Sequence, residues 1–127
     1  MKFLFLSLII GFYSIGFAQK NLEDGPYLHV ENDTIHYGII NQDYSELKTL
    51  KITNSGNQPL IISKCKASCG CTVPSCPSTP ILPGKSDWIN VRYDAKGKSG
   101  RFLKTITITS NAVNHTIYLK VKGFVKQ

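Results

Sequence analysis

The cysteines lie close together in the middle of the chain, and their thiols are the most reactive side chains that the sequence offers. An even number of cysteines in an exported domain is typical of a disulfide framework, although four cysteines allow three different pairings. A Cys65–Cys76 bond would close a short hairpin-like loop, which is an easy geometry, but spacing alone does not choose between the pairings. All four cysteines fall within the segment Lys64–Arg101: Cys65, Cys69, Cys71 and Cys76.

The same cysteines offer two further kinds of chemistry. A bond between Cys69 and Cys71 would enclose a single residue, and such a small, strained ring would be easily reduced, which favours a thiol-redox role. The spacing C-x3-C-x-C-x4-C would also let four thiolates converge in one loop, and soft thiolate ligands suit Cu(I) or zinc. The pattern lacks the two separated C-x2-C knuckles of a zinc ribbon. Disulfide, redox and soft-metal hypotheses all stay open, and the identity of any metal is unknown.

The first residues of the chain predict export. After Lys2, the segment Phe3–Phe17 is apolar or small, and it ends on the small residues that a signal peptidase reads. We expect a signal peptide over residues 1–18 and a single domain over residues 19–127, with cleavage between Ala18 and Gln19. The apolar run is shorter than the roughly 20 residues of a membrane-spanning helix, so no transmembrane span is expected after cleavage. The expected location is the periplasm or the extracellular side of the cell envelope.

The composition is basic, since 15 Lys and Arg residues against 8 Asp and Glu residues give a formal net charge of +7. A basic face attracts anionic polymers, lipid headgroups or glycans. Lysines on solvated strands also block edge-to-edge pairing between molecules, and this is the simpler interpretation. Nucleic acid is not an expected partner of an exported protein.

The sequence contains no catalytic pattern. The three histidines (His29, His36 and His115) lie on expected strands or beside a turn, far in sequence from the cysteines. The carboxylates are scattered, and no two are spaced for acid–base catalysis. The stretch Gly97–Gly100 lacks the strand–loop–helix context of a phosphate-binding loop. We therefore expect no enzymatic activity and no cofactor.

The remainder of the chain predicts short strands and no helix. In the clearest strand, Trp88 is expected on the face opposite Ile89, Val91 and Tyr93. The turn after Thr53 contains Gly56, which is free to take a positive φ. About seven short strands in about a hundred residues predict an all-β, antiparallel β-sandwich. The expected strands are Tyr27–Val30, Thr34–Ile39, Leu47–Thr53, Leu60–Cys65, Trp88–Asp94, Phe102–Thr109 and Ile117–Lys122.

The segment Ala67–Pro74, which contains Ser-Cys-Gly-Cys-Thr, resembles a family of short exported bacterial proteins grouped as a domain of unknown function and marked by an S-C-G-C-T motif. That family is similar to the immunoglobulin-like sandwiches of ciliary and centrosomal (Hydin-type) proteins and of pilus chaperones. The resemblance implies an immunoglobulin-like fold and no assigned enzymatic activity. It extends over nearly the whole chain after the leader, through Tyr37-Gly38, Asn54–Leu60, Pro80–Gly84, Val91–Tyr93, Gly97–Phe102 and Ser110-Asn111.

Two cysteines depart from the family pattern. Members of the family carry an apolar residue at the position of Cys65 and often tryptophan at the position of Cys76. The resemblance therefore implies that these two cysteines pair with each other, which leaves Cys69 and Cys71 to each other or free.

These features predict an exported, non-enzymatic immunoglobulin-like domain that binds another protein or an envelope polymer. Its open sheet edges are able to accept a partner strand. The alternative hypothesis is a thiol-redox or soft-metal module that uses Cys69 and Cys71.

Overall fold

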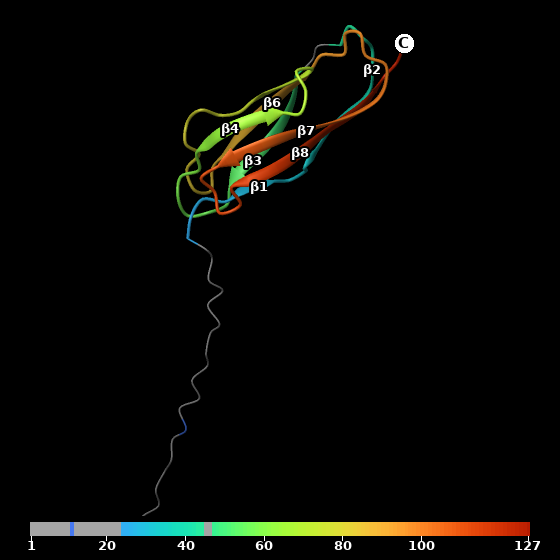
Figure 1. Ribbon diagram of the computed structural model, residues 1–127. Coiled ribbons are helices and arrows are strands. Elements are labelled where there is room, and N and C mark those ends of the chain that lie inside the picture. Colours follow the sequence, from blue (N-terminus) through green and yellow to red (C-terminus); the bar gives the residue numbers. More distant parts are fainter. Residues whose placement is uncertain (1–10, 12–23, 45–46) are drawn as a thin grey trace, which may run out of the picture.

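A computed structural model of the chain describes residue 11, residues 24–44 and residues 47–127, and it shows a β-sandwich (Figure 1). The expected signal peptide and its cleavage site lie outside the described residues. The expected all-β sandwich is confirmed. The described part holds eight strands and no helix: β1 (Leu28–Val30), β2 (Thr34–Ile40), β3 (Leu47–Asn54), β4 (Ile62–Ala67), β5 (Thr72–Ser75), β6 (Ser86–Tyr93), β7 (Gly100–Ser110) and β8 (Thr116–Val125).

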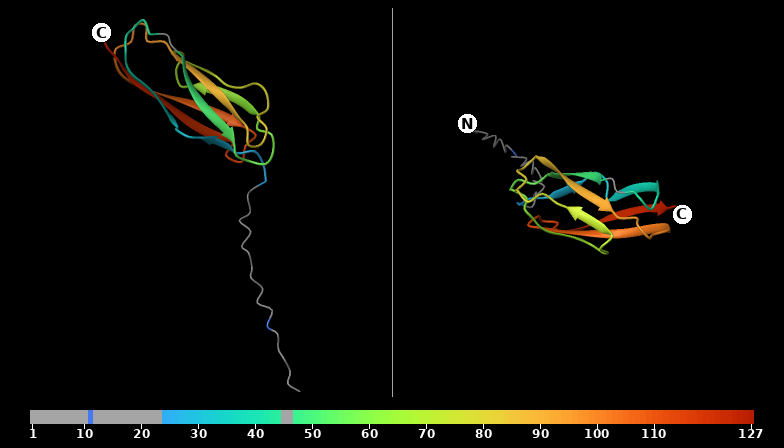
Figure 2. Two further views of the ribbon diagram at one scale, coloured as in Figure 1. Left: turned by 180° about the vertical axis from the view of Figure 1, so that it is seen from behind. Right: turned by 90° about the horizontal axis from the view of Figure 1, so that it is seen from above.

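The strands form two four-stranded sheets, which are seen as two layers in the right-hand view of Figure 2. The first sheet has the order β1-β3-β6-β5, and the second sheet has the order β2-β8-β7-β4. Four strands therefore lie at edges (β1, β5, β2 and β4), whereas β7 and β8 are central in the second sheet. The chain changes sheet after each of β1, β2, β3 and β4 and again after β6.

One pair of strands departs from the expected antiparallel arrangement. β2 runs parallel to β8, with Thr34 opposite Lys120 and Ile40 opposite Val125. A bulge between His36 and Gly38 interrupts the register. The strands of this pair lie at opposite ends of the domain sequence, and the alternation within each strand does not specify its neighbour.

The strand count differs from the expected seven because β5 lies within the cysteine segment, which was expected to be a loop. β5 contains Pro74, which has no backbone N–H to donate to a neighbouring strand, so the sequence favours a loop here. β5 is an edge strand that pairs only with β6. Proline is tolerated at an edge because the missing donor can face away from the ladder.

The core lies between the sheets and is built by alternation along each strand. In β7, isoleucines point inward and threonines point outward, and both residue types are β-branched and favour extended backbone. The predicted orientation of β6 is confirmed, since Ile89, Val91 and Tyr93 are buried and Trp88 is 53% exposed. Fully buried side chains of the core include Ile52, Leu60, Ile89, Val91, Ile106, Ile108, Leu119, Val121 and Val125.

Aromatic side chains tie the two sheets together at one end of the core. The rings of Tyr93 from the first sheet and Phe102 from the second sheet stack with centroids 3.9 Å apart. Tyr37 packs against both rings, and its hydroxyl donates a hydrogen bond of 2.7 Å to the carbonyl oxygen of Val91. This bond joins β2 to β6, so it links one sheet to the other.

The turn after β3 shows why glycine stands at position 56. Gly56 is free to take a positive φ but does not use that freedom, whereas Gly84 and Gly97 do. Glycine is needed here for space: a Cβ atom at this position would lie 2.1 Å from the carbonyl oxygen of Gly25 and 2.6 Å from the backbone nitrogen of Tyr27. The turn therefore packs directly on the backbone that leads into β1.

Candidate functional site

The cysteine segment joins the two sheets along one side of the sandwich. Cys65 lies on β4, at the edge of the second sheet, and Cys76 directly follows β5, at the edge of the first sheet. The structure places a disulfide between them, with Cα atoms 6.3 Å apart. Both residues are partly buried and pack against the core. This bond is a covalent link between edge strands of different sheets.

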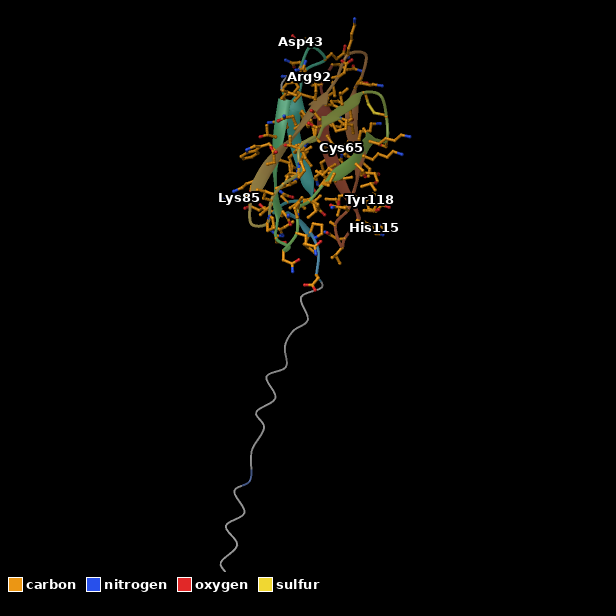
Figure 3. All side chains as sticks on the ribbon, turned by 90° about the vertical axis from the view of Figure 1, so that its left-hand side faces the viewer. Asp43, Cys65, Lys85, Arg92, His115 and Tyr118 are labelled. Atoms are coloured by element: carbon orange, nitrogen blue, oxygen red, sulfur yellow. A yellow bond between two sulfur atoms is a disulfide. The ribbon has the colours of Figure 1, made fainter. Side chains whose placement is uncertain are left out.

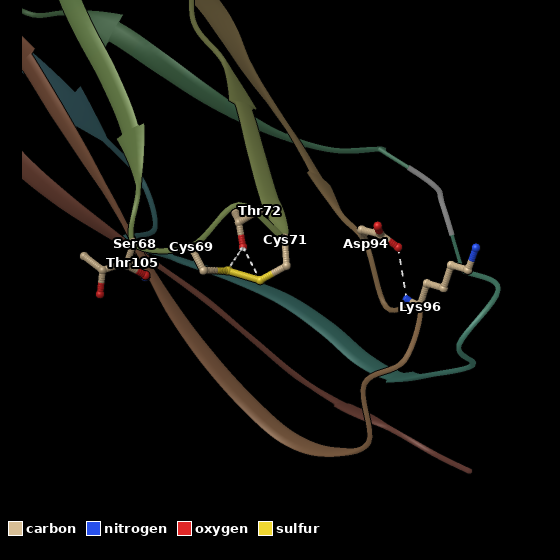
Figure 4. The surroundings of a disulfide bond; sticks show 7 residues. All are labelled: Ser68, Cys69, Cys71, Thr72, Asp94, Lys96 and Thr105. Atoms are coloured by element: carbon tan, nitrogen blue, oxygen red, sulfur yellow. Dashed lines mark hydrogen bonds between the residues drawn. A yellow bond between two sulfur atoms is a disulfide. The ribbon is translucent and has the colours of Figure 1, made fainter.

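The second disulfide, Cys69–Cys71, lies in the turn between β4 and β5 (Figure 4). The turn is fixed on both sides. The backbone N–H of Ser68 donates to the carbonyl oxygen of Thr105 on β7 (2.8 Å), and the backbone N–H of Asp94 donates to the carbonyl oxygen of Cys71 (2.8 Å). These bonds hold the turn against both sheets.

A buried hydroxyl lies beside this second disulfide. The Oγ1 atom of Thr72 is 3.7 Å from the Sγ atom of Cys69 and 4.0 Å from the Sγ atom of Cys71. Cys69 and Cys71 are themselves only partly buried. The arrangement places a hydrogen-bond donor next to sulfurs that solvent can reach, which is the environment a thiolate would need after reduction.

The bonding state of the cysteines limits what they can do in this structure. All four are in disulfides, and none is a free thiol. Among the described residues, no three His, Cys, Asp or Glu side chains come together as a metal-ligand set. Two disulfides indicate an oxidising compartment. No helix in the described part of the chain is long and apolar enough to cross a membrane.

A second candidate region is the outer face of the second sheet. Central strands β7 and β8 present alternate side chains to solvent there, and Tyr118 on β8 is 63% exposed. In Figure 3, Tyr118 lies on the opposite side of the domain from Lys85, which precedes β6 of the first sheet. The basic side chains exposed on this face are Lys64, Lys66, Arg101, Lys120 and Lys122.

One end of this face is hollowed and apolar. A shallow depression of about 410 Å³ is lined by residues of β2, β7 and β8. Its apolar side chains are Ile39, Leu103 and Phe124, which are 73%, 61% and 45% exposed. Residues of basic type border it: His36, Arg101 and Lys122. We call this depression the hollow.

The structure brings some of the predicted residues together and separates others. The cysteines form one cluster, whereas His36 lies in the hollow and His115 hydrogen-bonds to its neighbour Thr116. Sequence reasoning missed the contribution of Lys64 and Lys66 to the basic face. The signal was the alternation Lys-Cys-Lys in β4, which places both lysines on the face opposite Cys65.

No curated protein matches the sequence of this chain significantly. Among solved structures, a protein of unknown function from Porphyromonas gingivalis W83 has a TM-score of 0.70 at 19% identity, over 80% of this chain and 47% of that chain. This chain thus spans about half the length of that protein.

Two further structures show the same sandwich. The ASH/PapD-like domain 7 of human CEP192 has a TM-score of 0.62 at 10% identity, over 79% of this chain and 85% of that chain. The Escherichia coli chaperone DraB has a TM-score of 0.54 at 15% identity, over 79% of this chain and 54% of that chain. Identities this low show the fold alone, which is the immunoglobulin-like, PapD-like sandwich expected from the sequence.

The expected family membership is tested by the sequence of the chain, independently of its fold. Residues 28–125 match the family described as "protein of unknown function (DUF1573)". This range contains all eight strands and both disulfides. The chain therefore belongs to the DUF1573 family.

Proposed function

We propose that this chain is an exported, non-enzymatic binding domain that holds a protein or an envelope polymer on the outer face of its second sheet. The observation that carries the proposal is the hollow. The outer face of a sheet that packs on the core with one side only is normally polar, yet large apolar side chains from three adjacent strands are exposed here side by side. Apolar side chains gathered in this way mark interaction surfaces.

The compartment fits such a role. The two disulfides are stable where conditions are oxidising, and the apolar leader predicts export to the periplasm or beyond.

The test is a binding experiment with envelope material. The purified domain is immobilised and incubated with a solubilised envelope fraction, and the variant Ile39→Thr/Leu103→Thr is compared with Val73→Thr. Val73 is also exposed on a strand, at 56%, but it lies on the first sheet. We expect a captured component that the hollow variant loses and the control retains. A captured set that is the same for both variants would contradict the proposal.

A thiol-redox function is the second candidate, and it is supported by the position of Thr72 beside the Cys69–Cys71 bond. A thiolate of an external dithiol reductant would attack one sulfur and form a mixed disulfide, while the other cysteine leaves as a thiolate that Thr72 can hydrogen-bond. The second thiol of the reductant then resolves the mixed disulfide. The same reduced pair would offer two soft ligands to Cu(I) or zinc.

Thiol counting in glutathione buffers of graded redox potential tests this candidate. Two thiols that appear and disappear reversibly within the range of the buffers would support it. No free thiol over the whole range would exclude glutathione-level redox chemistry.

A further inference from the structure

We propose that the outer face of the second sheet binds a linear acidic polysaccharide along an elongated track of five basic side chains. The track consists of Lys64, Lys66, Lys120, Lys122 and Arg101. The inference rests on the proposed function and names the class of its partner.

The strand register defines the track. Residues that pair across neighbouring strands share a face of the sheet, so every second residue of β7 marks one row across that face. Each of the five rows contains one basic side chain. Along β7 the rows are Thr109 with Lys64 and Thr116; Thr107 with Lys66 and Tyr118; Thr105 with Lys120 and Thr34; Leu103 with Lys122 and His36; and Arg101 with Phe124 and Ile39.

The rows give the track its dimensions. Successive rows are about 6.8 Å apart, since a strand rises about 3.4 Å per residue. Five rows therefore extend over roughly 27 Å. The basic side chains lie on edge strand β4 in the first two rows, on β8 in the next two and on β7, which lies between β4 and β8, in the last row. The track is therefore elongated along the strands and spans three of them.

The charge on this face has one sign. None of the four strands of the second sheet contains Asp or Glu. Within the described part of the chain, the acidic residues lie in loops or on β6, and no ion pair joins one of them to the five basic residues of the track. The other lysine of these strands, Lys104, pairs with Val121 and belongs to the inner face.

Protection of the sheet edge does not explain these residues. Lysines that block edge-to-edge pairing lie on edge strands, which fits Lys64 and Lys66 on β4. Lys120 and Lys122 lie on β8, where each has a partner residue on β2 and another on β7. These two cations are thus placed where a role at the edge is not possible. Arg101 lies on the part of β7 that extends beyond the pairing with β4.

The remaining side chains favour a sugar polymer as the anion. Three of the rows also carry a threonine hydroxyl of β7 beside the cation (Thr105, Thr107 and Thr109), and these hydroxyls can hydrogen-bond to hydroxyl and carboxylate oxygens. The ring of Tyr118 lies exposed among them and can pack on the face of a sugar. A second copy of this face would be repelled by its like charges. A bilayer could take up Ile39, Leu103 and Phe124 at one end of the face, but it would gain little from the threonine rows, which offer no apolar side chain to insert.

Polygalacturonate is a suitable probe because it is linear and carries a carboxylate on each sugar. Oligomers of increasing length are titrated into the purified domain by calorimetry at low and high salt. We expect the affinity to rise with oligomer length until the track is spanned and then to level off. Affinity should fall as salt rises, since binding releases counterions. Fully methyl-esterified polygalacturonate, which keeps the sugars and loses the charge, should bind at least ten-fold more weakly.

Matched charge variants locate the site. Lys120→Gln/Lys122→Gln should weaken binding by about ten-fold or more and reduce the log–log salt slope by about two, roughly one for each removed cation. Lys51→Gln/Lys85→Gln makes the same change in net charge away from the second sheet and should bind as the unaltered domain does. Equal losses in the two variants would overturn the track, as would the absence of any binding.

Two competitors decide the chemical class. Inorganic polyphosphate of similar length and vesicles containing phosphatidylglycerol should compete poorly. Equal competition by either would overturn the assignment to a polysaccharide. If polygalacturonate fails to bind but envelope capture still depends on Ile39 and Leu103, the track is wrong and the proposed binding function stands. If both fail, the binding function itself is wrong.

Discussion

Asn54 is a fully buried polar residue whose side chain organises the end of the first sheet. Its Oδ1 atom accepts hydrogen bonds from the backbone N–H groups of Tyr27 and Gly56, at 3.2 and 3.0 Å. Its Nδ2 atom donates to the carbonyl oxygens of Gln58 and Ile81, at 2.7 and 2.8 Å. One side chain thus satisfies four backbone groups from three segments, which explains why a polar residue is tolerated at 0% exposure.

The change Asn54→Ala should lower the free energy of unfolding by on the order of 3 kcal/mol, because several backbone groups would lose their partners in a buried place. Asn57→Ala is the matched control, since the Asn57 side chain bonds to Gly25 and Asp24 in an exposed turn. The control should lose about 1 kcal/mol. Urea denaturation followed by circular dichroism measures both, and equal losses would show that the buried network has no special role.

Tyr37 predicts a loss of stability at alkaline pH. Burial, and secondarily the neighbouring Tyr44, raise the pKa of Tyr37 from 10.0 to about 12. Burial also raises the pKa of Tyr93. A tyrosine in the unfolded chain ionises near pH 10, whereas Tyr37 in the folded protein keeps its proton up to about pH 12. The stabilisation of the folded state that depends on protonated Tyr37 is therefore complete below pH 10, and it is lost as pH rises from 10 to 12.

Tyr37→Phe should make this alkaline decline shallower. At neutral pH the variant should be less stable by about 1 kcal/mol, because the carbonyl oxygen of Val91 loses its donor. Urea denaturation at several pH values between 8 and 11.5 measures both effects. If the free energy of unfolding of the variant fell as steeply with pH as that of the unaltered protein, the ionisation of Tyr37 would not be the cause of the alkaline decline.

For single residues, the sequence predicted the orientation of side chains better than it predicted their roles. Alternation placed Trp88 outside and Ile89 inside, because one buried face imposes a period of two. The role of Gly56 was not predictable, since the backbone that approaches it comes from Gly25, 31 positions earlier in the sequence. The basic track was not predictable from the sequence, because the alignment of Lys120 and Lys122 with Lys64 and Lys66 depends on strand order.

Among the elements, the two edge strands joined by Cys65–Cys76 show most clearly what a sequence pattern omits. β5 is four residues long and contains proline, so neither its length nor its alternation marks it as a strand. β4 and β5 belong to different sheets, so no backbone ladder joins them. The disulfide supplies the link that hydrogen bonds supply elsewhere in the fold.

Replacement of this disulfide should depend on whether both cysteines are changed. The bond should contribute on the order of 2–3 kcal/mol through the loop that it closes. Cys65→Val/Cys76→Trp should still fold, because both positions pack against the core and an apolar pair can fill the space. Either single change should do worse than the double change, since it leaves a reactive thiol beside a second disulfide.

Thermal denaturation of the two single variants and the double variant measures this order. Peptide mapping of the non-reduced protein provides the independent check of the pairing. A map that links Cys65 to Cys69 or Cys71 would contradict it, as would a double variant less stable than both single variants.

In the whole molecule, charge is distributed unequally between the two sheets. The disulfides lie along the β4–β5 side, and the basic residues of the track spread over the outer face of the second sheet. The first sheet carries charges of both signs, with Asp87 and Arg92 on β6. The sandwich class was predictable because it follows from strand number and alternation. The unequal faces were not, because they depend on which strands meet in each sheet.

The exported form of the whole chain should differ from its precursor at the N-terminus and should hold its cysteines as disulfides. If the apolar leader is a signal peptide, the protein recovered from the envelope or medium should begin at Gln19. In an oxidising compartment it should contain no free thiol, and full reduction should raise its mass by about 4 Da, one hydrogen for each cysteine.

Intact-mass spectrometry before and after reduction, together with N-terminal sequencing, measures both properties in one preparation. The same domain produced in a reducing cytosol without residues 1–18 is the control, and it should contain reactive thiols until it is oxidised. An exported form that retains Met1 would contradict the predicted cleavage. Free thiols in a correctly cleaved form would instead contradict the disulfide framework, so the two parts of the compartment argument fail separately.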